Sequence, residues 1–285
     1  MPELASTRLR PVVSSQNALV KTLRQAFSQG QAVDGLCAVE GIRLIEEAIR
    51  SRLKLRALFV RESAQAKAQR ILDQLSKHAE AVLLPDRVFD SAVLTDHPQG
   101  IAALVKVPEH DLQAVLSARP ALAVVAAAIQ DPGNFGTLIR SAEAFGASGV
   151  VGIEGTVNHW NPKTVRASAG SIFRLPVLRT NATELLTELR NRQIRVLGLV
   201  APHSEARSGD GDGSGPRSPI RLQDANLVSP CALFIGNEGA GLPREVLANI
   251  DQFVTIPQAR VESLNAGVAA SIALYEAQRQ RSALS

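Results

Sequence analysis

Short apolar runs alternate with amphipathic segments over the first hundred residues of the chain. A buried strand is a short continuous apolar run, whereas a surface helix repeats its apolar residues three or four positions apart. On this basis, strands are predicted at 55–60, 81–84 and 101–107, and helices at 17–27, 42–50, 66–76 and 86–92. Strands and helices in this alternation predict a small α/β/α sandwich domain.

A second series of alternating segments begins near residue 121. The run 121–129 is apolar throughout, which is typical of a central strand covered on both faces. Further strands are predicted at 149–153, 172–178, 195–200, 231–235 and 253–256, and helices at 135–145, 161–169 and 183–192. The second half of the chain is therefore predicted to be an α/β domain with a parallel sheet.

The last two predicted strands each end in residues suited to a ligand site. Gly236 stops the run 231–235, and Pro257 stops the run 253–256. Parallel strands deliver their following loops to one edge of the sheet, where ligands bind in open α/β folds. These two loops and their continuations contain close-approach glycines, the carboxylate of Glu238 and small polar groups: Gly236, Gly239, Gly241, Ser263 and Asn265. The pattern predicts a compact polar ligand site.

The helix predicted at 263–278 has two kinds of side chain. Large apolar residues occur at helical spacing on one side, and alanines occupy much of the rest. The large residues are Leu264, Val268, Ile272 and Tyr275, and the alanines are Ala266, Ala269, Ala270, Ala273 and Ala277. Such a helix favours close approach to the sheet, to another subunit, or to both.

Three segments interrupt the regular order. Residues 1–15 lack periodicity and include Arg8 and Arg10, which predicts a mobile basic arm. Residues 108–120 are predicted to be a linker with a helical piece. The segment 202–219 is rich in glycine and lacks large apolar residues, which predicts a disordered surface insertion. Its two aspartates lack the closing glutamate of a calcium loop, so that interpretation is not favoured.

The amino-acid composition narrows the expected location of the protein and the expected class of binding partner. The 285 residues have a formal net charge of +4, and residues 1–110 contain 15 Lys and Arg against 12 Asp and Glu. This basic excess is weak support for a nucleic-acid partner. The two cysteines are far apart and the five histidines are isolated, which favours neither a disulfide framework nor a metal site. Without an apolar run long enough for a membrane span, a cytoplasmic protein is expected.

Three sequence motifs contain residues that could take part in catalysis or ligand binding. In 131–140, Asn134 lies near a helix start and could be a cap, while Arg140 lies on a largely apolar helix where a guanidinium could bind phosphate or activate a neighbour. The 236–241 segment has glycine spacing G-x-x-G-x-G, which fits neither a dinucleotide fingerprint nor a phosphate loop. In the third motif, Ser263 could be an ordinary helix cap. Taken singly, each motif is compatible with a purely structural role.

The order and spacing of the three motifs resemble a known family. DPGNFGTLIRSAEAFG, LFIGNEGAGLP and IPQARVESLNAGVAASIALYE are similar to motifs 1, 2 and 3 of the SpoU, or TrmH-like, RNA ribose 2′-O-methyltransferases of the SPOUT superfamily, as is VRASAGSIFRLPV between them. SSQNALVKTLR, AVEGIRLIEEAI and HPQGIAALV resemble the family's L30e-like substrate-binding domain. The chain departs from the family where basic residues are expected, because 29–37 contains none.

The resemblance implies an α/β fold with an L30e-like domain at 1–108, a linker at 109–120 and a SPOUT methyltransferase domain at 121–285. It further implies a parallel sheet with a deep trefoil knot, S-adenosylmethionine as the cofactor, RNA as the substrate, no metal, and a homodimer formed through the C-terminal domain. The implied cofactor contacts are Gly236, Ile256 and Leu264. The implied catalytic surroundings are Asn134, Arg140, Glu238, Ser263 and Asn265. The resemblance implies that Arg140 is the proton acceptor, but a guanidinium holds its proton too strongly for that task. Arg140 is therefore expected to grip the phosphate beside the target ribose and to polarise the ribose hydroxyl.

Several functions are compatible with these motifs. A ribosomal RNA ribose methyltransferase of the 23S type is favoured because the separate N-terminal domain resembles that type. The alternatives are a tRNA ribose methyltransferase and an RNA-binding homologue that has lost catalysis, although the motif residues are intact. An NAD-dependent oxidoreductase is disfavoured by the glycine spacing. The target nucleotide is not defined by the sequence.

Overall fold

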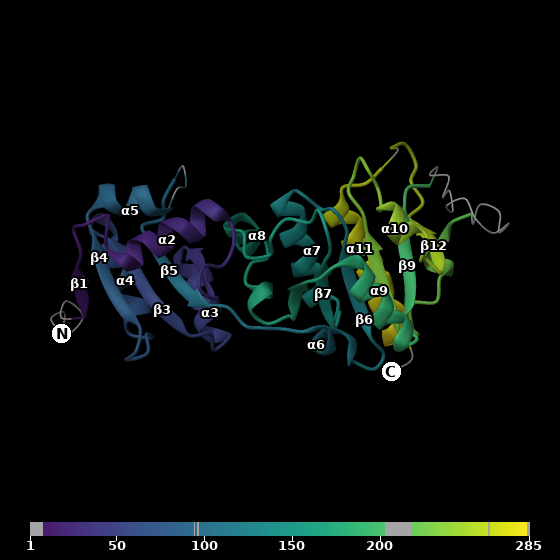
Figure 1. Cartoon of the computed structure of the whole chain (residues 1–285), viewed down its shortest axis with the longest axis horizontal. Helices are drawn as coiled ribbons and strands as arrows, with labels where there is room; N and C mark the ends of the chain where they lie inside the picture. Colours follow the sequence, from purple (N-terminus) through teal and green to yellow (C-terminus); the bar gives the residue numbers. More distant parts are fainter. Residues whose placement is uncertain (1–7, 94, 96, 203–217, 262, 284–285) are drawn as a thin grey trace. The chain divides into compact units, whose positions relative to one another are not determined.

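A computed structural model describes residues 8–93, 95, 97–202, 218–261 and 263–283. The chain divides into two compact units (Figure 1). The first unit contains residues 1–108 and 160–173, and the second contains 109–159 and 174–285. The prediction of a disordered insertion falls mostly on 203–217, outside the described residues. Among the described residues, no helix has the length and apolar character needed to cross a membrane.

The first unit is built on a five-stranded sheet in the order β1-β4-β3-β5-β2. Its alanine, valine and leucine side chains alternate between two covered faces. Helices α2 and α5 pack together on one face, and α3 and α4 pack together on the other (Figure 1). The elements are β1 (Leu9–Pro11), α2 (Ala18–Gln29), β2 (Leu36–Glu40), α3 (Ile42–Arg50), β3 (Leu55–Arg61), α4 (Gln65–Leu72), β4 (Glu80–Leu84), α5 (Asp86–Val93), β5 (Ile101–Lys106) and α8 (Pro162–Ala167).

Two strands of this sheet were not predicted from the pattern. Leu9–Pro11 pairs with β4, and Arg10 forms an ion pair of 3.1 Å with Glu80, so the prediction of a mobile arm is wrong for the described part of 1–15. Arg8 donates from Nη1 to the Leu72 carbonyl at 2.9 Å. Leu36–Glu40 forms β2 and pairs antiparallel with β5. Backbone pairing orders both segments although their side chains give little periodic signal.

The second unit contains a seven-stranded sheet in which all the strands are parallel, in the order β10-β12-β9-β11-β6-β7-β8. The predicted central strand, β6, lies between β11 and β7 and is buried along its length. The elements are α6 (Leu112–Leu116), β6 (Leu122–Ala126), α7 (Pro132–Ala144), β7 (Gly149–Gly152), β8 (Val177–Arg179), α9 (Ala182–Asn191), β9 (Arg195–Val200), β10 (Ile220–Arg221), β11 (Cys231–Ile235), α10 (Arg244–Leu247), β12 (Gln252–Thr255) and α11 (Ala266–Ser282). The predicted parallel sheet is confirmed.

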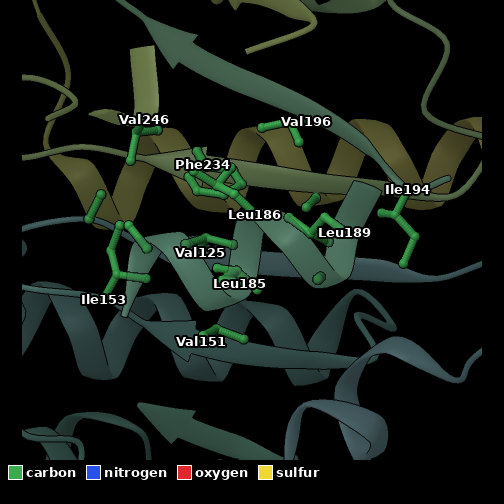
Figure 2. Close-up of a cluster of buried hydrophobic side chains, with 14 of the residues drawn as sticks. Val125, Val151, Ile153, Leu185, Leu186, Leu189, Ile194, Val196, Phe234 and Val246 are labelled. Atoms are coloured by element: carbon green, nitrogen blue, oxygen red, sulfur yellow. The ribbon is translucent and has the colours of Figure 1, made fainter. Parts of the chain in front are cut away.

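One face of this sheet forms the main core of the unit. Leu185 and Leu189 of α9, together with Val246 of α10, pack on Val125 and Phe234 of the central strands (Figure 2). The predicted linker 109–120 also contributes, because its helix α6 buries Val115 and Leu116 in the same cluster. The trefoil knot stays a prediction, since strand order does not define how the chain threads.

The other face is covered by α7 and α11, which run side by side. The Ser141 and Ser271 hydroxyls lie 2.7 Å apart, and the rings of Phe145 and Tyr275 meet edge to face at 5.9 Å. A Cβ atom added to Gly267 would lie 3.2 Å from Thr137. These contacts recur every four residues on both helices, so small side chains allow the two helices to approach closely along a parallel seam.

The two sides of α11 have the reverse of the usual amphipathic arrangement. The small residues Ala270, Ala273 and Ala277 are fully buried. Val268, Ile272 and Tyr275 are instead 46%, 38% and 55% exposed. The structure therefore uses the alanines for packing within the chain and leaves an apolar stripe on the surface, defined by Val268, Ile272 and Tyr275.

The C-terminal end of α11 is fixed by one arginine. The Arg281 guanidinium donates to the carbonyls of Leu227 at 2.8 Å, Pro120 at 2.9 Å and Ala121 at 3.0 Å. Since these carbonyls precede β11 and β6, Arg281 joins the helix to the amino ends of two central strands.

We expect Arg281→Ala to lower the free energy of unfolding by about 2–4 kcal/mol, because several charge-assisted hydrogen bonds are lost and partly buried carbonyls lose their donor. Arg279→Ala is the matched control. Arg279 is exposed and paired with Glu276 at 2.8 Å, so its loss should cost less than about 1 kcal/mol. Urea unfolding measures both values, and equal losses would show that the Arg281 contacts are unimportant.

Candidate functional site

Three of the predicted site residues form one hydrogen-bonded network. The Asn134 amide nitrogen donates to Glu238 Oε1, and the Asn265 amide nitrogen donates to Asn134 Oδ1 at 2.8 Å. Glu238 Oε1 also accepts from the backbone N–H of Ala266 at 3.2 Å. The network joins the first turns of α7 and α11 to the loop after β11. The three motifs, more than a hundred residues apart at their extremes, therefore converge at the carboxyl edge of the sheet.

The network also explains how a carboxylate is held at this edge. Glu238 contacts the first backbone N–H of α11, where the positive end of the helix dipole stabilises negative charge. The same helix start is capped by Asn265, whose Oδ1 accepts from the Val268 N–H at 3.2 Å. Asn265 thus performs two tasks: it caps α11 with its oxygen and orients Asn134 with its nitrogen.

The loop after β11 folds back on itself around Asn237. The backbone groups of Asn237 and Gly241 bond reciprocally, at 2.9 and 3.1 Å. Asn237 Oδ1 accepts from the N–H groups of Gly239 at 2.9 Å and Ala240 at 3.0 Å. Its amide nitrogen donates to the Ala128 carbonyl at 3.3 Å, which links this loop to the one that precedes α7.

Glycine is required at the start of this loop. A Cβ atom on Gly236 would lie 2.5 Å from the backbone carbonyl carbon and oxygen of Gly241. Because backbone atoms cannot move aside as a flexible side chain can, only glycine permits the turn. The loop therefore presents its backbone at close range to the adjacent cavity.

A cavity of about 340 Å³ lies between this loop, the end of β9 and the segment leading into α11. This volume is in the range of small-molecule sites, about 300–1,000 Å³. All three residues predicted to contact a cofactor line it, namely Gly236, Ile256 and Leu264. Glu238 and Ser263 line it as well. Most of the remaining lining is apolar or backbone.

One polar atom in the lining lacks a partner. The Gln258 side-chain oxygen is buried and forms no hydrogen bond with any described residue. A buried acceptor without a donor is unfavourable by about 1–3 kcal/mol, so this cavity suits a ligand that brings a hydrogen-bond donor. A flat, largely apolar molecule with an amino group, such as an adenine ring, satisfies this requirement.

The structure separates Arg140 from the network. Arg140 is exposed on α7, six residues beyond Asn134, and is not among the residues that line the cavity. Six helical residues correspond to a displacement of about 9 Å along the axis. Within the described part of the chain, Arg140 forms no ion pair or side-chain hydrogen bond. It lies on the solvent side of the α7–α11 pair, as the apolar stripe of α11 does.

Two cap interpretations from the sequence are wrong. Asp131, not Asn134, caps α7, since Asp131 Oδ1 accepts from the Asn134 N–H at 2.8 Å. Asn265, not Ser263, caps α11. Both corrections leave Asn134 and Ser263 without a helix-capping role, and Asn134 uses its side chain for the network instead.

Comparisons with known proteins define the class of protein. The model of the SpoU rRNA methylase family matches residues 121–275, and that of the MRM3-like substrate binding domain matches residues 20–103. The first match covers more than half of the chain. The chain therefore belongs to the SpoU rRNA methylase family, as its three motifs indicated.

Similar proteins extend over nearly the whole chain. The 23S rRNA (guanosine(2553)-2′-O)-methyltransferase RlmP of Bacillus subtilis is 32% identical over 94% of this chain and 98% of its own. The 23S rRNA (uridine(2479)-2′-O)-methyltransferase of Streptomyces viridochromogenes is 31% identical over 85% of this chain and 82% of its own. The crystal structure of the SpoU methyltransferase AviRb from that organism, in complex with AdoMet, superposes with a TM-score of 0.76 at 28% identity, covering 93% of this chain and 98% of AviRb.

Proposed function

We propose that this chain transfers a methyl group from S-adenosylmethionine to a ribose 2′-hydroxyl of 23S-type ribosomal RNA. The observation that supports this most strongly is the convergence of Asn134, Glu238 and Asn265 beside the glycine loop and its cavity. Membership of the SpoU family and the 23S rRNA methyltransferases among its relatives support the same reaction.

The cavity fits this cofactor by its size and by its lining. We propose that the backbone at Gly236, Ile256 and Leu264 holds the cofactor, and that Gln258 accepts a hydrogen bond from its adenine amino group. When bound, S-adenosylmethionine supplies a methyl group that is already strongly electrophilic. The protein must therefore align the ribose hydroxyl with that methyl group and assist loss of the proton.

The network residues have positioning roles in this proposal. Glu238, which lines the cavity, accepts from the Asn134 amide nitrogen, and Asn265 donates to the Asn134 amide oxygen, so Asn134 is held in one orientation next to a residue of the cavity wall. Ser263 lines the same cavity, is exposed, and is proposed to contact the ribose. Arg140 is proposed to bind the phosphate next to the target ribose and to polarise its hydroxyl. A guanidinium suits this role because it is a poor proton acceptor and a good bidentate donor.

We further propose that the protein acts as a homodimer in which the apolar stripe of α11 contacts a second copy. Exposed large apolar side chains in a contiguous row mark protein interfaces. Arg140 lies on the solvent side of the adjacent helix α7, so an interface through this stripe would bring Arg140 close to a second copy. This arrangement would account for an active-site arginine that does not reach the cavity of its own chain.

We expect Ile272→Glu to raise the dimer dissociation constant at least about 100-fold, because a carboxylate buried without a partner costs several kcal/mol. Sedimentation velocity at micromolar concentration should then show a monomer. Gln278→Glu adds the same charge to an exposed position of α11 outside the stripe and should leave the dimer intact. A monomeric unmodified protein, or an unchanged Ile272→Glu dimer, would contradict the proposal.

The substrate is proposed to be ribosomal RNA rather than tRNA because the chain has a separate N-terminal domain that matches a substrate-binding model. Cytoplasmic action belongs to the same proposal. Mapping of ribose methylation on ribosomal and transfer RNA from cells with and without the protein tests it. One 23S rRNA ribose should lose its methyl group in the deletion strain, and a change confined to tRNA would favour the alternative substrate.

A further inference from the structure

Exposed basic side chains gather at one end of the sheet of the first unit. The basic patch is defined by Arg52, Lys54 and Arg56, before and within β3, and by Lys106 at the end of β5. The Lys106 N–H donates to the Lys54 carbonyl at 2.8 Å, which places these two residues side by side. Lys106 also pairs with Leu36 on its other side, so it lies beside the turn that leads into β2.

The local backbone directs these cations outward. Arg52, Lys54 and Arg56 are exposed, whereas Leu55 is buried, and the register between β3 and β5 shifts at Leu55/Ala57. A bulge of this kind adds one residue, here Arg56, and redirects side chains. Arg56 bonds to Glu80 at 2.7 Å, but within the described residues Arg52, Lys54 and Lys106 form no ion pair.

Arg52 occupies a backbone position that favours glycine. Its φ is 60°, and it follows α3 in a turn where the Arg52 N–H donates to the Ile49 carbonyl and the Leu53 N–H to the Ala48 carbonyl. This is the helix-ending pattern in which glycine is the usual residue, because a side chain is strained there. The chain thus places an arginine at a position where its side chain costs stability, which suggests a use for the charge.

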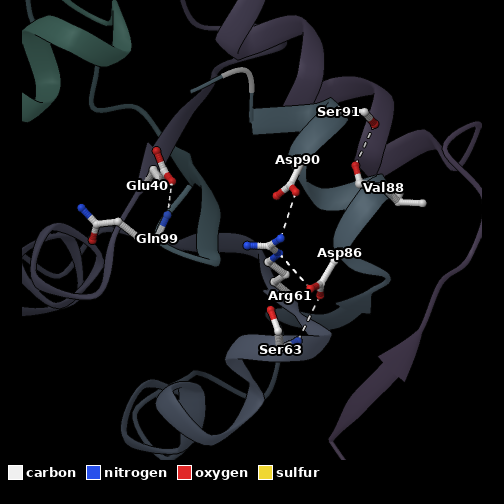
Figure 3. Close-up of polar contacts among 8 residues, drawn as sticks. All are labelled: Glu40, Arg61, Ser63, Asp86, Val88, Asp90, Ser91 and Gln99. Carbon is white, nitrogen blue, oxygen red and sulfur yellow. Dashed lines mark hydrogen bonds and ion pairs between the residues drawn. The ribbon is translucent and has the colours of Figure 1, made fainter. Parts of the chain in front are cut away.

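The opposite end of the same sheet differs in its charges. Arg61, at the end of β3, is held by Asp86 at 3.3 Å and Asp90 at 3.0 Å (Figure 3). Glu40, at the end of β2, accepts from the Gln99 N–H at 2.7 Å (Figure 3). The Ser63 backbone N–H lowers the pKa of Asp86, so this carboxylate stays ionised. Fixed carboxylates thus neutralise Arg61 at that end, which reduces its attraction for a polyanion.

We propose that the basic patch binds the phosphate backbone of the RNA substrate. The inference rests on the proposed function. Residues 29–37 lack the basic residues that the family resemblance leads us to expect. Beside that segment, positive charge is supplied instead by Lys54, Arg56 and Lys106. An anionic membrane is the less suitable partner. Surface-bound membrane segments combine basic residues with exposed apolar ones, and none of the exposed large apolar side chains of the described residues lies in the patch.

The test compares two triple variants that each remove three positive charges. Arg52→Gln/Lys54→Gln/Lys106→Gln alters the patch. Arg43→Gln/Lys67→Gln/Arg87→Gln is the matched control, because these exposed residues follow the carboxyl ends of β2, β3 and β4, at the opposite end of the strands. Filter binding to in vitro transcribed 23S rRNA over a range of KCl concentrations gives the affinity and its salt dependence.

The patch variant should bind the RNA about 100-fold more weakly at 0.1 M KCl. The slope of log K against log[KCl] should also fall in magnitude by about 2, because three positive charges are removed and each lost phosphate contact contributes about 0.7–0.9 to that slope. The control should change much less. Arg52→Gly should bind RNA more weakly than the unmodified protein while its melting temperature stays the same or rises, which separates the charge from folding.

Equal affinities and slopes for the patch variant and the unmodified protein would overturn the inference, as would a larger loss in the control. Either result could occur while methyl transfer remains normal, so it would leave the proposed function standing. Conversely, a protein that shows the expected salt dependence but transfers no methyl group to ribose would refute the proposed function alone. No binding of 23S rRNA by the unmodified protein would refute both.

Discussion

Arg140→Ala is expected to slow single-turnover methyl transfer by about 10²- to 10⁴-fold, the usual contribution of a group that activates a reacting hydroxyl. Affinity for S-adenosylmethionine should stay nearly normal, because Arg140 does not line the cavity of its own chain. Arg140→Lys should recover little of the rate, since an ammonium keeps the charge but lacks the planar pair of donors. Rapid-quench kinetics with labelled cofactor and calorimetric titration, on one preparation, measure both quantities.

Arg190→Ala is a suitable control for this experiment. Arg190 is exposed on α9 and hydrogen-bonds Asn249 at 3.1 Å, so its loss should affect the rate by less than about threefold, which is under 1 kcal/mol of barrier. If Arg140→Ala behaves like Arg190→Ala, the arginine has no catalytic role. A parallel loss of cofactor affinity would instead assign Arg140 to cofactor binding.

Gly236→Ala should weaken S-adenosylmethionine binding about 10- to 100-fold. The added methyl group would come within 2.5 Å of the Gly241 backbone, and overpacking against atoms that cannot yield costs about 1–3 kcal/mol. The loop must open to relieve the contact, and the backbone groups that face the cavity move with it. Calorimetric titration with S-adenosylmethionine measures the change directly.

Gly239→Ala is the matched control in the same loop. Its added Cβ would lie 3.6 Å from Asn237 Oδ1, which is ordinary contact, so cofactor affinity should change by less than about threefold. Equal affinities for Gly236→Ala and Gly239→Ala would mean that the tight turn at Gly236 does not shape the cofactor site.

The sequence predicted the elements with strong periodicity and missed those ordered by backbone pairing. The helix predicted at 42–50 matches α3, and the apolar run 121–129 contains the central strand β6. The edge strands β1 and β2 escaped prediction because a three-residue strand with a proline and a short run after a turn give little periodic signal. These two strands form only by pairing with β4 and β5, which are distant from them in the sequence.

The sequence distinguished two kinds of side chain on α11 but left open whether the helix packs on the sheet, on another subunit, or on both. In the structure, the small residues Gly267 and Ser271 of α11 meet α7, and Val268 and Ile272 are exposed. Helical spacing shows that the two faces of a helix differ, but it does not show what each face packs against. The exposed stripe follows only once the contacts of α7 with α11 are known.

The sequence predicted which residues form the candidate site but not which hydrogen bonds join them. The rule that parallel strands send their loops to one edge predicted that Glu238 and Asn265 lie together, and the family resemblance added Asn134. Asn237 and Gln258 were missed. The first acts by folding a loop, and the second is notable only because its oxygen is buried without a partner. A glycine-flanked Asn in a tight turn was the one available signal for Asn237.

The most direct test of the central claim is nucleoside analysis after reaction of the purified protein with 23S rRNA transcript and S-adenosylmethionine carrying an isotopically labelled methyl group. The RNA is digested to nucleosides, and mass spectrometry locates the label on base or ribose. The account predicts label on the ribose 2′-oxygen of 23S rRNA, its near absence from tRNA, and its loss with Arg140→Ala. Label on a base, or no transfer by a protein that binds both RNA and cofactor, would contradict it.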